Sequence, residues 1–270
     1  MLALALDSST LTLSCALAEL AADGAVRVLA ESLHAPPHKT GDALPGALQE
    51  VCASAGRTLD DVSAIAVGLG PGSFTGLRVG AAAAKALAYA RRWPACGCSS
   101  LHALALGAAA YVEPGTLVVA TTEARKGELY AAAFRQEPPL KDLKLVHGEA
   151  VFAAAAFAEW LRRLPGPYAL VGSGARACAG LLAAAGVDVD ALAPAGAPDT
   201  PPASAVAVLC AAALRAGAFD PASLFALGPN YLRPSEAEVA LGQGRVGGLS
   251  PAQKAAGVGP EDHSTGGSGR

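Results

Sequence analysis

A glycine-rich stretch, GLGPGSFTGLRVG, occupies residues 68–80 and is the first segment whose residue types could do chemistry. Glycine-rich turns that open a helix often bind phosphate through backbone N–H groups. The stretch matches none of the common nucleotide motifs, because no lysine follows its glycines before Lys85, and Ser73 or Thr75 stands where the dinucleotide fingerprint requires glycine. Generic anion binding at the start of the following helix stays open. The residues that could contact an anion here are Gly70, Gly72, Ser73 and Thr75.

Small residues recur every four positions along the helix that follows this stretch. They are Gly76, Gly80, Ala84 and Ala88. Residues four apart share one helix face, so this face carries almost no side chain. Glycine inside a helix costs roughly 1 kcal/mol relative to alanine, so Gly80 requires a close approach by another backbone. That backbone belongs either to the protein's own sheet or to a partner's helix.

The apolar pattern predicts the elements that position these residues. LALALD, at residues 2–7, predicts a buried strand that delivers Asp7 to the end of a sheet. Two further strands, with a turn at Asp23-Gly24, precede a helix over about 41–55. VSAIAVGLG then predicts the strand that leads into the glycine stretch, and LRVGAAAAKALAYA predicts the helix after it.

The pattern restarts near residue 105. It predicts a hairpin that turns at Lys126-Gly127, a helix over AVFAAAAFAEWLRRL, a strand at YALVGSG and a helix over about 203–216. Two such units in series predict an α/β protein with lobes at 1–105 and 106–238, the last helix packing back on the first lobe. Residues 239–270 are expected to form a disordered tail, because they carry too little apolar surface to offset their ordering entropy.

Composition limits the classes of function. The chain has 270 residues, 52% of them hydrophobic, and a net charge of -3, so no basic surface is expected to grip nucleic acid directly. Six cysteines are too few for a disulfide scaffold, and the Cys96-Gly97-Cys98 pair lacks the second pair of a zinc site, which favours buried or idle thiols. The chain shows neither a signal peptide nor a run long enough to span a bilayer, and we expect a soluble, cytoplasmic protein.

Several motifs together resemble one protein family. GPGSFTGLRVG is similar to the signature of the TsaB (YeaZ) family of bacterial tRNA threonylcarbamoyladenosine biosynthesis proteins. LALDSST resembles the opening strand and turn of that family, and HKTGDALP resembles its entry to the first helix. ATTEARKGELYAAAF is similar to the family's second hairpin, and LGPNYLRPSEAE to its ending. The resemblance extends from residue 1 to about residue 238.

This resemblance implies a fold, a function and partners. The fold is the two-lobed, actin-like (ASKHA, ribonuclease-H-type) α/β fold, in which each lobe is a mixed sheet flanked by helices. Members do not catalyse threonylcarbamoyl transfer; they pair with the homologous catalytic subunit TsaD, and with the ATPase TsaE, to modify A37 of tRNAs that read ANN codons. Contact with tRNA is expected to be indirect, and a homodimer is expected when the partner is absent. Pairing runs through first-lobe helices, which assigns the partner interface to Gly76, Arg78, Gly80, Ala84 and Ala88.

A metal site is not expected. His34 and His38, in HAPPH, have the spacing of the helical metal pair in the catalytic homologue. Pro36 and Pro37 between them oppose a helix, and no third ligand lies nearby. The segment therefore predicts a solvated or capping role for the two histidines.

The remaining catalytic equipment of an actin-like ATPase is also incomplete. Its second phosphate loop would carry Glu123, where the family commonly has aspartate, and its adenosine loop would be reduced to Gly172-Ser173-Gly174. We therefore expect no catalytic residue and no cofactor of its own, and ATP or ADP with Mg²⁺ would bind at the partner interface. The first phosphate loop would be Asp7, Ser8, Ser9 and Thr10, which equally fit a capped turn at a strand end.

Two other functions compete with the subunit role. A free-standing actin-like ATPase or small-molecule kinase is the main alternative, and nucleotide binding by the isolated chain would favour it. Protease chemistry, which older naming of the wider family suggests, needs an activated nucleophile. No base is visible for Ser9 or Ser73, so the sequence disfavours a protease.

Overall fold

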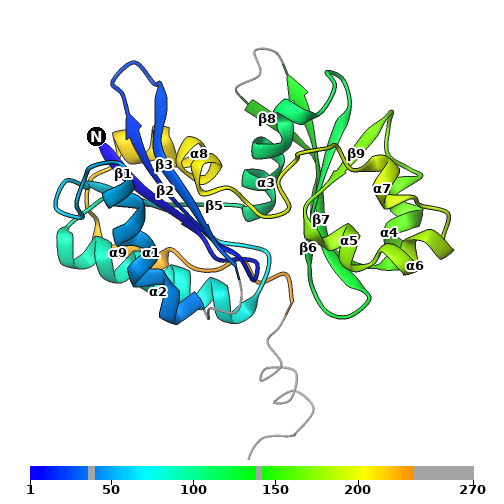
Figure 1. Ribbon diagram of the computed structural model, residues 1–270, viewed down its shortest axis with the longest axis horizontal. Helices are drawn as coiled ribbons and strands as arrows, with labels where there is room; N and C mark the ends of the chain where they lie inside the picture. The colour runs from blue at the N-terminus through cyan, green and yellow to red at the C-terminus, as the bar shows by residue number, and fades with distance from the viewer. Residues whose placement is uncertain (36–39, 138–141, 234–270) are drawn as a thin grey trace, which may run out of the picture. The chain divides into compact units, whose positions relative to one another are not determined.

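The computed structural model describes residues 1–35, 40–137 and 142–233 (Figure 1). The first sheet has the strand order β3-β2-β1-β4-β5. Its central strand β1 runs antiparallel to β2 and parallel to β4, so the sheet is mixed. The strands are β1 (Leu2–Asp7), β2 (Leu13–Leu20), β3 (Val26–His34), β4 (Ala64–Gly68) and β5 (Ala95–Cys98).

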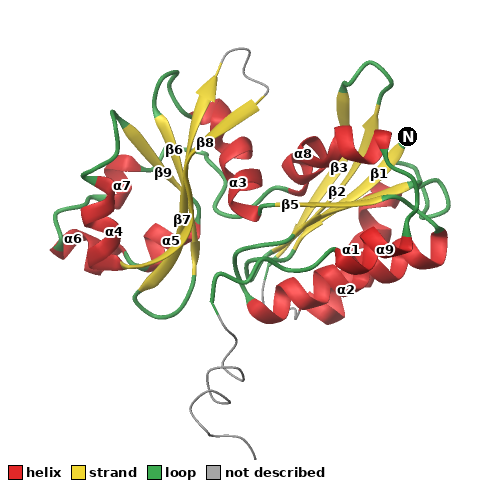
Figure 2. Ribbon diagram, turned by 180° about the vertical axis from the view of Figure 1, so that it is seen from behind, coloured by secondary structure: helices red, strands yellow, loops and turns green. Residues whose placement is uncertain are grey.

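The two faces of the first sheet differ in side-chain size. Successive residues of a strand point to opposite faces. In β1, Leu4 and Leu6 pack against α1 (Thr40–Ser54) and α2 (Phe74–Arg91), whereas Ala3 and Ala5 pack against α8 (Ala203–Ala216). Alanine on this second face lets α8 lie close to the strands. Figure 2 shows α1 and α2 on one side of the sheet and α8 on the other.

The second sheet has the order β8-β7-β6-β9 and is also mixed, because β6 pairs antiparallel with β7 and parallel with β9. One face packs on α3, and the other packs on the short helices α4 to α7. The elements are α3 (Ser100–Ala108), the 3-10 turn η1 (Ala109–Tyr111), β6 (Leu117–Glu123), β7 (Glu128–Glu137), β8 (Asp142–Ala153), α4 (Ala154–Leu161), β9 (Tyr168–Val171), α5 (Ser173–Ala177), α6 (Ala179–Ala184) and α7 (Val189–Leu192). The last helix, α9 (Pro221–Ala226), packs beside α2.

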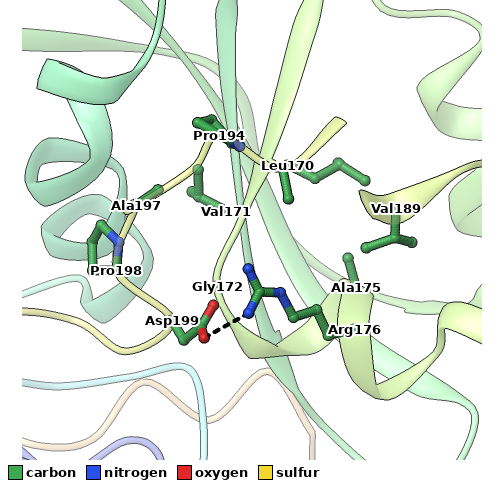
Figure 3. Close-up of a pocket in the computed structure, with 11 residues that line it drawn as sticks. Leu170, Val171, Gly172, Ala175, Arg176, Val189, Pro194, Ala197, Pro198 and Asp199 are labelled. Atoms are coloured by element: carbon green, nitrogen blue, oxygen red, sulfur yellow. Dashed lines mark hydrogen bonds and ion pairs between the residues drawn. The ribbon is translucent and has the colours of Figure 1, made fainter. Parts of the chain in front are cut away.

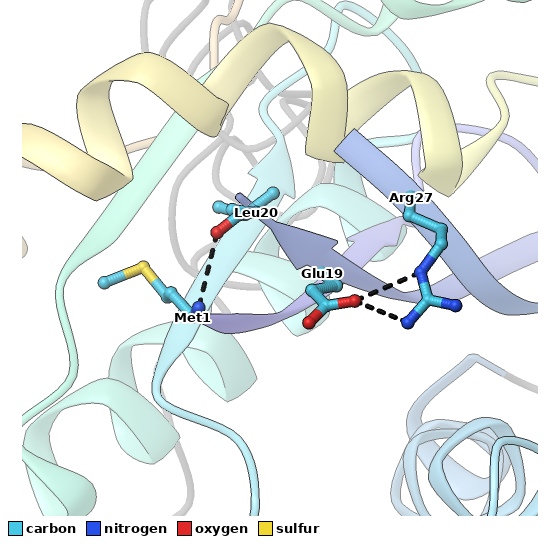
Figure 4. A network of polar contacts seen from close by, with 4 residues as sticks. All are labelled: Met1, Glu19, Leu20 and Arg27. Atoms are coloured by element: carbon cyan, nitrogen blue, oxygen red, sulfur yellow. Dashed lines mark hydrogen bonds and ion pairs between the residues drawn. The ribbon is translucent and has the colours of Figure 1, made fainter. Parts of the chain in front are cut away.

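The start of the chain is held by β2 (Figure 4). The amino group of Met1 donates to the carbonyl of Leu20, and the amide of Leu20 donates back to Met1 at 2.8 Å. Beside this pair, Arg27 of β3 forms an ion pair with Glu19 of β2 at 2.6 Å, and hydrogen bonding to Arg27 lowers the pKa of Glu19. The start of β1 is therefore fixed against β2.

Most of the predicted elements are confirmed. The three opening strands, the first two helices, the hairpin at 117–137 and the helix at 203–216 appear as expected. The helix predicted over AVFAAAAFAEWLRRL is wrong at its start, because β8 continues to Ala153 and Phe152 pairs with Leu129 of β7. The sequence pattern does not predict strand β5, helix α3 or most of β8.

One helix crosses the expected division of the chain. Helix α8, although it follows the second sheet in the sequence, packs on β1, β2, β4 and β5 of the first. The predicted tail at 239–270 lies outside the described residues, as do Pro36, Pro37 and His38. In the described part of the chain, no helix is long and apolar enough to cross a membrane.

Candidate functional site

Asp7, at the end of β1, is held by its own chain. Its carboxylate accepts hydrogen bonds from the backbone N–H of Ser9 at 2.9 Å, from the hydroxyl of Ser9 at 2.6 Å and from the hydroxyl of Ser100 at 2.6 Å. Burial raises the pKa of Asp7, and the hydrogen bonds from Ser100 and Ser9 oppose that rise. The residue is 1% exposed. Both oxygens are engaged by the chain itself, and a contact of Asp7 with an anion or nucleotide stays a prediction.

Ser8 and Ser9 are likewise held by hydrogen bonds within the chain. The hydroxyl of Ser8 donates to the carbonyl of Gly76 in α2 at 2.8 Å, and both serines are buried. The backbone carbonyl of Ser9 accepts from the amide of Ser73 at 2.6 Å. These serines fasten the turn after β1 to the start of α2. Their predicted role in a phosphate loop stays a prediction.

The glycine stretch allows the turn after β1 to lie against the start of α2. A Cβ atom on Gly72 would overlap the carbonyl of Ser9, and one on Gly76 would overlap the carbonyl of Ser8. The amide of Gly70 donates to the hydroxyl of Ser100 at 2.9 Å, so it is not free to bind an anion. The hydroxyl of Ser73 caps α2 by accepting from the amide of Gly76 at 3.2 Å. The glycines therefore permit close approach, as the sequence predicts, and the approaching backbone is the chain's own.

The small-residue face of α2 is directed inward. Gly76 and Gly80 contact the turn after β1, while Ala84 and Ala88 are fully buried in the core between α2 and the first sheet. The resemblance assigns these four residues to the partner interface, whereas in the structure the chain's own turn and sheet cover them. Arg78, the fifth residue of that prediction, is exposed.

Exposed aromatic residues gather on the opposite side of α2. The guanidinium of Arg78 lies 3.8 Å from the ring centroid of Phe74 and donates to the hydroxyl of Tyr231 at 3.0 Å. Farther along the helix, Tyr89 packs on Phe225 of α9 with 5.9 Å between ring centroids. Tyr89 is 57% exposed and Phe225 is 66% exposed. We call these five residues the α2–α9 face.

Sequence reasoning missed most of this face. Tyr89 lies well beyond the glycine stretch in α2, and Phe225 and Tyr231 come from a much later part of the chain. The signal that could have found it is the composition of the segment after α8, which places aromatic residues close together in a chain where aromatics are only 5%. Aromatic residues and arginine are the types enriched at protein interfaces.

A pocket of about 370 Å³ collects the loops that the sequence marked as phosphate or adenosine loops. The lining residues are Thr10, Leu11, Thr12, Ser73, Glu123, Ala124, Ser173 and Thr200. Of the residues predicted to contact an anion, Thr10 and Ser73 line this pocket, whereas Gly70 and Gly72 are not among the lining residues, and neither is Thr75, which is exposed.

These residues do not fit a self-contained Mg²⁺-nucleotide site. Glu123 is the single carboxylate among the described residues that line the pocket, and Asp7 is buried rather than part of the lining. Gly174 lies against Thr122 of β6, where a Cβ would overlap the strand backbone, so this loop packs on its own sheet. A hard cation prefers several oxygen ligands, and the described lining offers one charged ligand and a few hydroxyls.

A second pocket is too small for a ligand. It lies beside β9 and α5 and has a volume of about 10 Å³, which is room for one water. At its edge Arg176 forms an ion pair with Asp199 at 2.8 Å (Figure 3). This ion pair ties α5 to the segment before α8.

The predicted histidine pair can be assessed at one member only. The ring Nε2 of His34 lies 3.0 Å from the hydroxyl of Ser32 and 4.0 Å from the carboxylate of Glu50, while His38 lies outside the described residues. Among residues 1–35, 40–137 and 142–233, no group of three or more His, Cys, Asp or Glu side chains is arranged to hold a metal ion.

Comparison with known proteins bears on the family and the fold. Residues 38–241 match the family model described as TsaD, tRNA N6-adenosine threonylcarbamoyltransferase. The tRNA threonylcarbamoyladenosine biosynthesis protein TsaB of Escherichia coli is 35% identical over 175 residues, which are 63% of this chain and 71% of that protein. The TsaB protein of Haemophilus influenzae is 38% identical over 139 residues, which are 52% of this chain and 56% of that protein.

A solved structure agrees with these matches. YeaZ from Pseudomonas aeruginosa superposes with a TM-score of 0.62 at 27% identity, covering 86% of this chain and 99% of that one. A second structure, described as an uncharacterized protein with similarity to peptidase YEAZ from the same organism, gives 0.63 at 27% identity. The predicted α/β fold with two mixed sheets flanked by helices is confirmed, and it is the fold of YeaZ.

Proposed function

The chain belongs to the TsaB (YeaZ) family of tRNA threonylcarbamoyladenosine biosynthesis proteins, and from that premise we propose that it is a non-catalytic subunit. In this proposal it pairs with the homologous catalytic subunit TsaD, works with the ATPase TsaE, and activates transfer of threonylcarbamoyl to A37 of tRNAs that read ANN codons. It meets tRNA only through that complex. A homodimer forms when TsaD is absent.

The observation that carries the proposal is the state of Asp7. A catalytic carboxylate on this fold must reach a metal ion, a water molecule or a phosphate group. Both oxygens of Asp7 instead accept hydrogen bonds from Ser9 and Ser100, and the side chain is buried. Releasing this carboxylate would leave buried hydroxyl groups without an acceptor, which costs about 1–3 kcal/mol for each group. The acid therefore stabilises the turn that positions α2.

The α2–α9 face is the surface that we assign to TsaD. It replaces the buried small-residue face of α2 in that role, and only Arg78 is common to both. Exposed tyrosine, phenylalanine and arginine at one surface have the composition of an interface hot spot. Gly76 and Gly80 contribute indirectly, because they let α2 lie against the turn after β1 and so fix the helix that carries the face.

The residues that line the pocket also bear on nucleotide binding. The pocket at Thr10, Ser73 and Glu123 lacks the carboxylates that a Mg²⁺-nucleotide needs. We propose that ATP or ADP with Mg²⁺ binds there only when the partner supplies further ligands. Calorimetry on the isolated chain discriminates this from a free-standing ATPase or kinase, because submillimolar binding with turnover would support the alternative function.

A matched pair of tyrosine variants tests the interface. The chain is co-purified with TsaD from the same organism, and the dissociation constant is measured for Tyr89→Ala and for Tyr111→Ala, which is similarly exposed at 50% but lies outside the face. We expect Tyr89→Ala to weaken binding about 30-fold, the effect of a hot-spot loss of about 2 kcal/mol, and Tyr111→Ala to leave it unchanged. Equal affinities for the two variants would remove the α2–α9 face from the interface.

The pathway is tested separately in cells. Depletion of the protein should lower threonylcarbamoyladenosine in tRNA, and unchanged levels would contradict the proposed function. Expression of Asp7→Asn should restore the modification once its stability is compensated by a lower growth temperature. A folded Asp7→Asn protein that binds TsaD but restores nothing would indicate a catalytic role for this carboxylate.

A further inference from the structure

Three cysteines gather on one face of the first sheet. Cys96 and Cys98 are alternate residues of β5, so both side chains point to the same face, toward α8. Cys210, in the middle of α8, is fully buried between the helix and the sheet. Cys96 and Cys98 pack against the same cluster of buried side chains that contains Cys210, and the thiol of Cys210 interacts with the thiols of both. All three are free cysteines.

The three thiols differ in access to solvent. Strand β5 ends the sheet order, and Cys96 and Cys98 are both partly exposed, whereas Cys210 is 0% exposed. The thiol of Cys96 donates to the carbonyl of Gly97 at 3.7 Å. The interaction with Cys210, and then burial, raise the pKa of Cys96 above its ordinary value of 9.0. Cys98 is the remaining thiol that combines exposure with contact to Cys210.

The side chains around the sulfur atoms are small. The neighbours of β5 on this face are Ala66 and Gly68 of β4, which pair with Cys96 and Cys98. Alanine also dominates the facing side of α8. Small side chains do not separate the strand from the helix, so a thiol of β5 and the thiol of Cys210 can meet without displacing a large neighbour. The described cysteines are not arranged to hold a metal ion, which leaves oxidation as the chemistry open to them.

We propose that Cys98 and Cys210 form a reversible disulfide when a peroxide reaches the partly exposed side of β5. The thiolate of Cys98 attacks one peroxide oxygen, the O–O bond breaks, and Cys98 becomes a sulfenic acid while water leaves. The sulfur of Cys210 then attacks the sulfur of Cys98, and the hydroxide that is displaced takes the proton of Cys210 and leaves as a second water. Two thiols and one hydrogen peroxide thus give one disulfide and two waters.

The crosslink would act on the proposed site through β5. It joins β5 to α8 and encloses the whole second sheet, β6 to β9, in one covalent loop. Cys98 is followed directly by Ser99 and Ser100, and Ser100 holds both Asp7 and Gly70. Fixing the end of β5 to α8 therefore fixes the serine that holds the glycine stretch. The inference is independent of the proposed function.

Peptide mapping of the full chain tests the proposal. The protein is treated with hydrogen peroxide, unreacted thiols are alkylated, and trypsin releases residues 93–125, with Cys96 and Cys98, and residues 177–215, with Cys178 and Cys210. We expect a crosslink between these two peptides and a loss of two thiols. Cys178→Ser is the matched control, because Cys178 shares the peptide with Cys210 but lies in the core of the second sheet, and it should keep the crosslink.

Further variants identify which two sulfur atoms form the disulfide. Cys210→Ala, which suits the alanine-rich face, and Cys98→Ser, at the edge strand, should each slow disulfide formation at least about tenfold, while Cys96→Ser should keep it. Dimedone should trap a sulfenic acid at Cys98 in Cys210→Ala. If Cys210→Ala fails to fold, the Cys98→Ser variant decides. A crosslink that survives loss of Cys98 or Cys210, a disulfide between Cys96 and Cys98, or no crosslink at peroxide levels that oxidise Cys98 would overturn the proposal.

Discussion

Replacing Gly80 with alanine separates two explanations of the glycine stretch. If the glycine served a partner helix, Gly80→Ala would leave the isolated chain folded, or stabilise it by about the 1 kcal/mol of helix propensity that alanine gains. In the structure the new methyl group would overlap the hydroxyl of Ser8 and lie 3.1 Å from Cδ1 of Leu6. Both neighbours are buried, so neither can move into solvent. We therefore expect loss of stability.

The magnitude follows from the atoms that must move. Overpacking a buried contact costs about 1–3 kcal/mol, and displacing the Ser8 hydroxyl from the carbonyl of Gly76 costs about 1–3 kcal/mol more. After the gain in helix propensity is subtracted, the net loss is roughly 3 kcal/mol. In a chain of this length 1 kcal/mol shifts the melting temperature by about 2–4 °C, so Tm should fall by about 6–12 °C.

Thermal unfolding of three variants tests this reasoning. Gly46→Ala is the matched control, because Gly46 lies inside α1 and a Cβ added there would have no neighbouring atom within 4 Å, so its Tm should rise slightly. Ser8→Ala combined with Gly80→Ala should recover at least about 1 kcal/mol relative to the sum of the single changes, because the Cβ of residue 8 is 3.4 Å from the new methyl group. A Gly80→Ala protein as stable as Gly46→Ala would refute packing against the chain's own turn.

Two further outcomes concern the carboxylate that holds the same turn. Ser100→Ala removes the hydroxyl that donates to Asp7 and accepts from the amide of Gly70. The free energy of unfolding, measured by urea denaturation, should therefore fall by about 2–4 kcal/mol. An unchanged denaturation midpoint would contradict the hydrogen-bond assignment. Burial raises the pKa of Asp7 above its ordinary 3.8. The folded state therefore binds the proton of Asp7 more tightly than the unfolded state does. The stability that this protonated group contributes is lost as pH rises from about 3.8 through the raised pKa. The stability of wild type relative to Asp7→Asn should therefore increase as pH falls from about 7 toward about 4, and a constant difference would show that Asp7 titrates alike in both states.

Local pattern is enough to predict most elements of the fold. The alternation in LALALD and the helical spacing of Leu44, Leu48 and Val51 each reflect burial on one face, and burial is what the structure shows at those positions. Strand β5 could not be predicted, because ACGC has no alternation and its strand character comes from pairing with β4. The end of β8 differs from the prediction because AVFAAAAF suits a helix, and pairing of Phe152 with Leu129 overrides that preference.

The site is harder to predict than the fold. Periodicity shows that Gly76, Gly80, Ala84 and Ala88 share a face, but it does not tell which partner covers that face. The answer depends on Ser8, which lies 68 residues before Gly76 and reaches it only because β1 and β4 are neighbours. Likewise nothing in DSST indicates that Ser100 will complete the bonds of Asp7.

The glycines and the aromatic residues of α2 therefore act on opposite sides of one helix. On the inner side, the glycines carry no side chain, so the turn after β1 can lie against α2. The hydroxyl of Ser8 in this turn donates a hydrogen bond to α2, and the turn accepts one from the amide of Ser73. These contacts leave α2 little freedom to shift. On the outer side, the same helix presents Phe74, Arg78 and Tyr89, which form the Arg78–Phe74 and Tyr89–Phe225 pairs. A rigid face loses less conformational entropy on binding than a mobile one, so close packing inside increases affinity outside. Loosening the inner contact should thus weaken TsaD binding even in variants that keep every residue of the outer face.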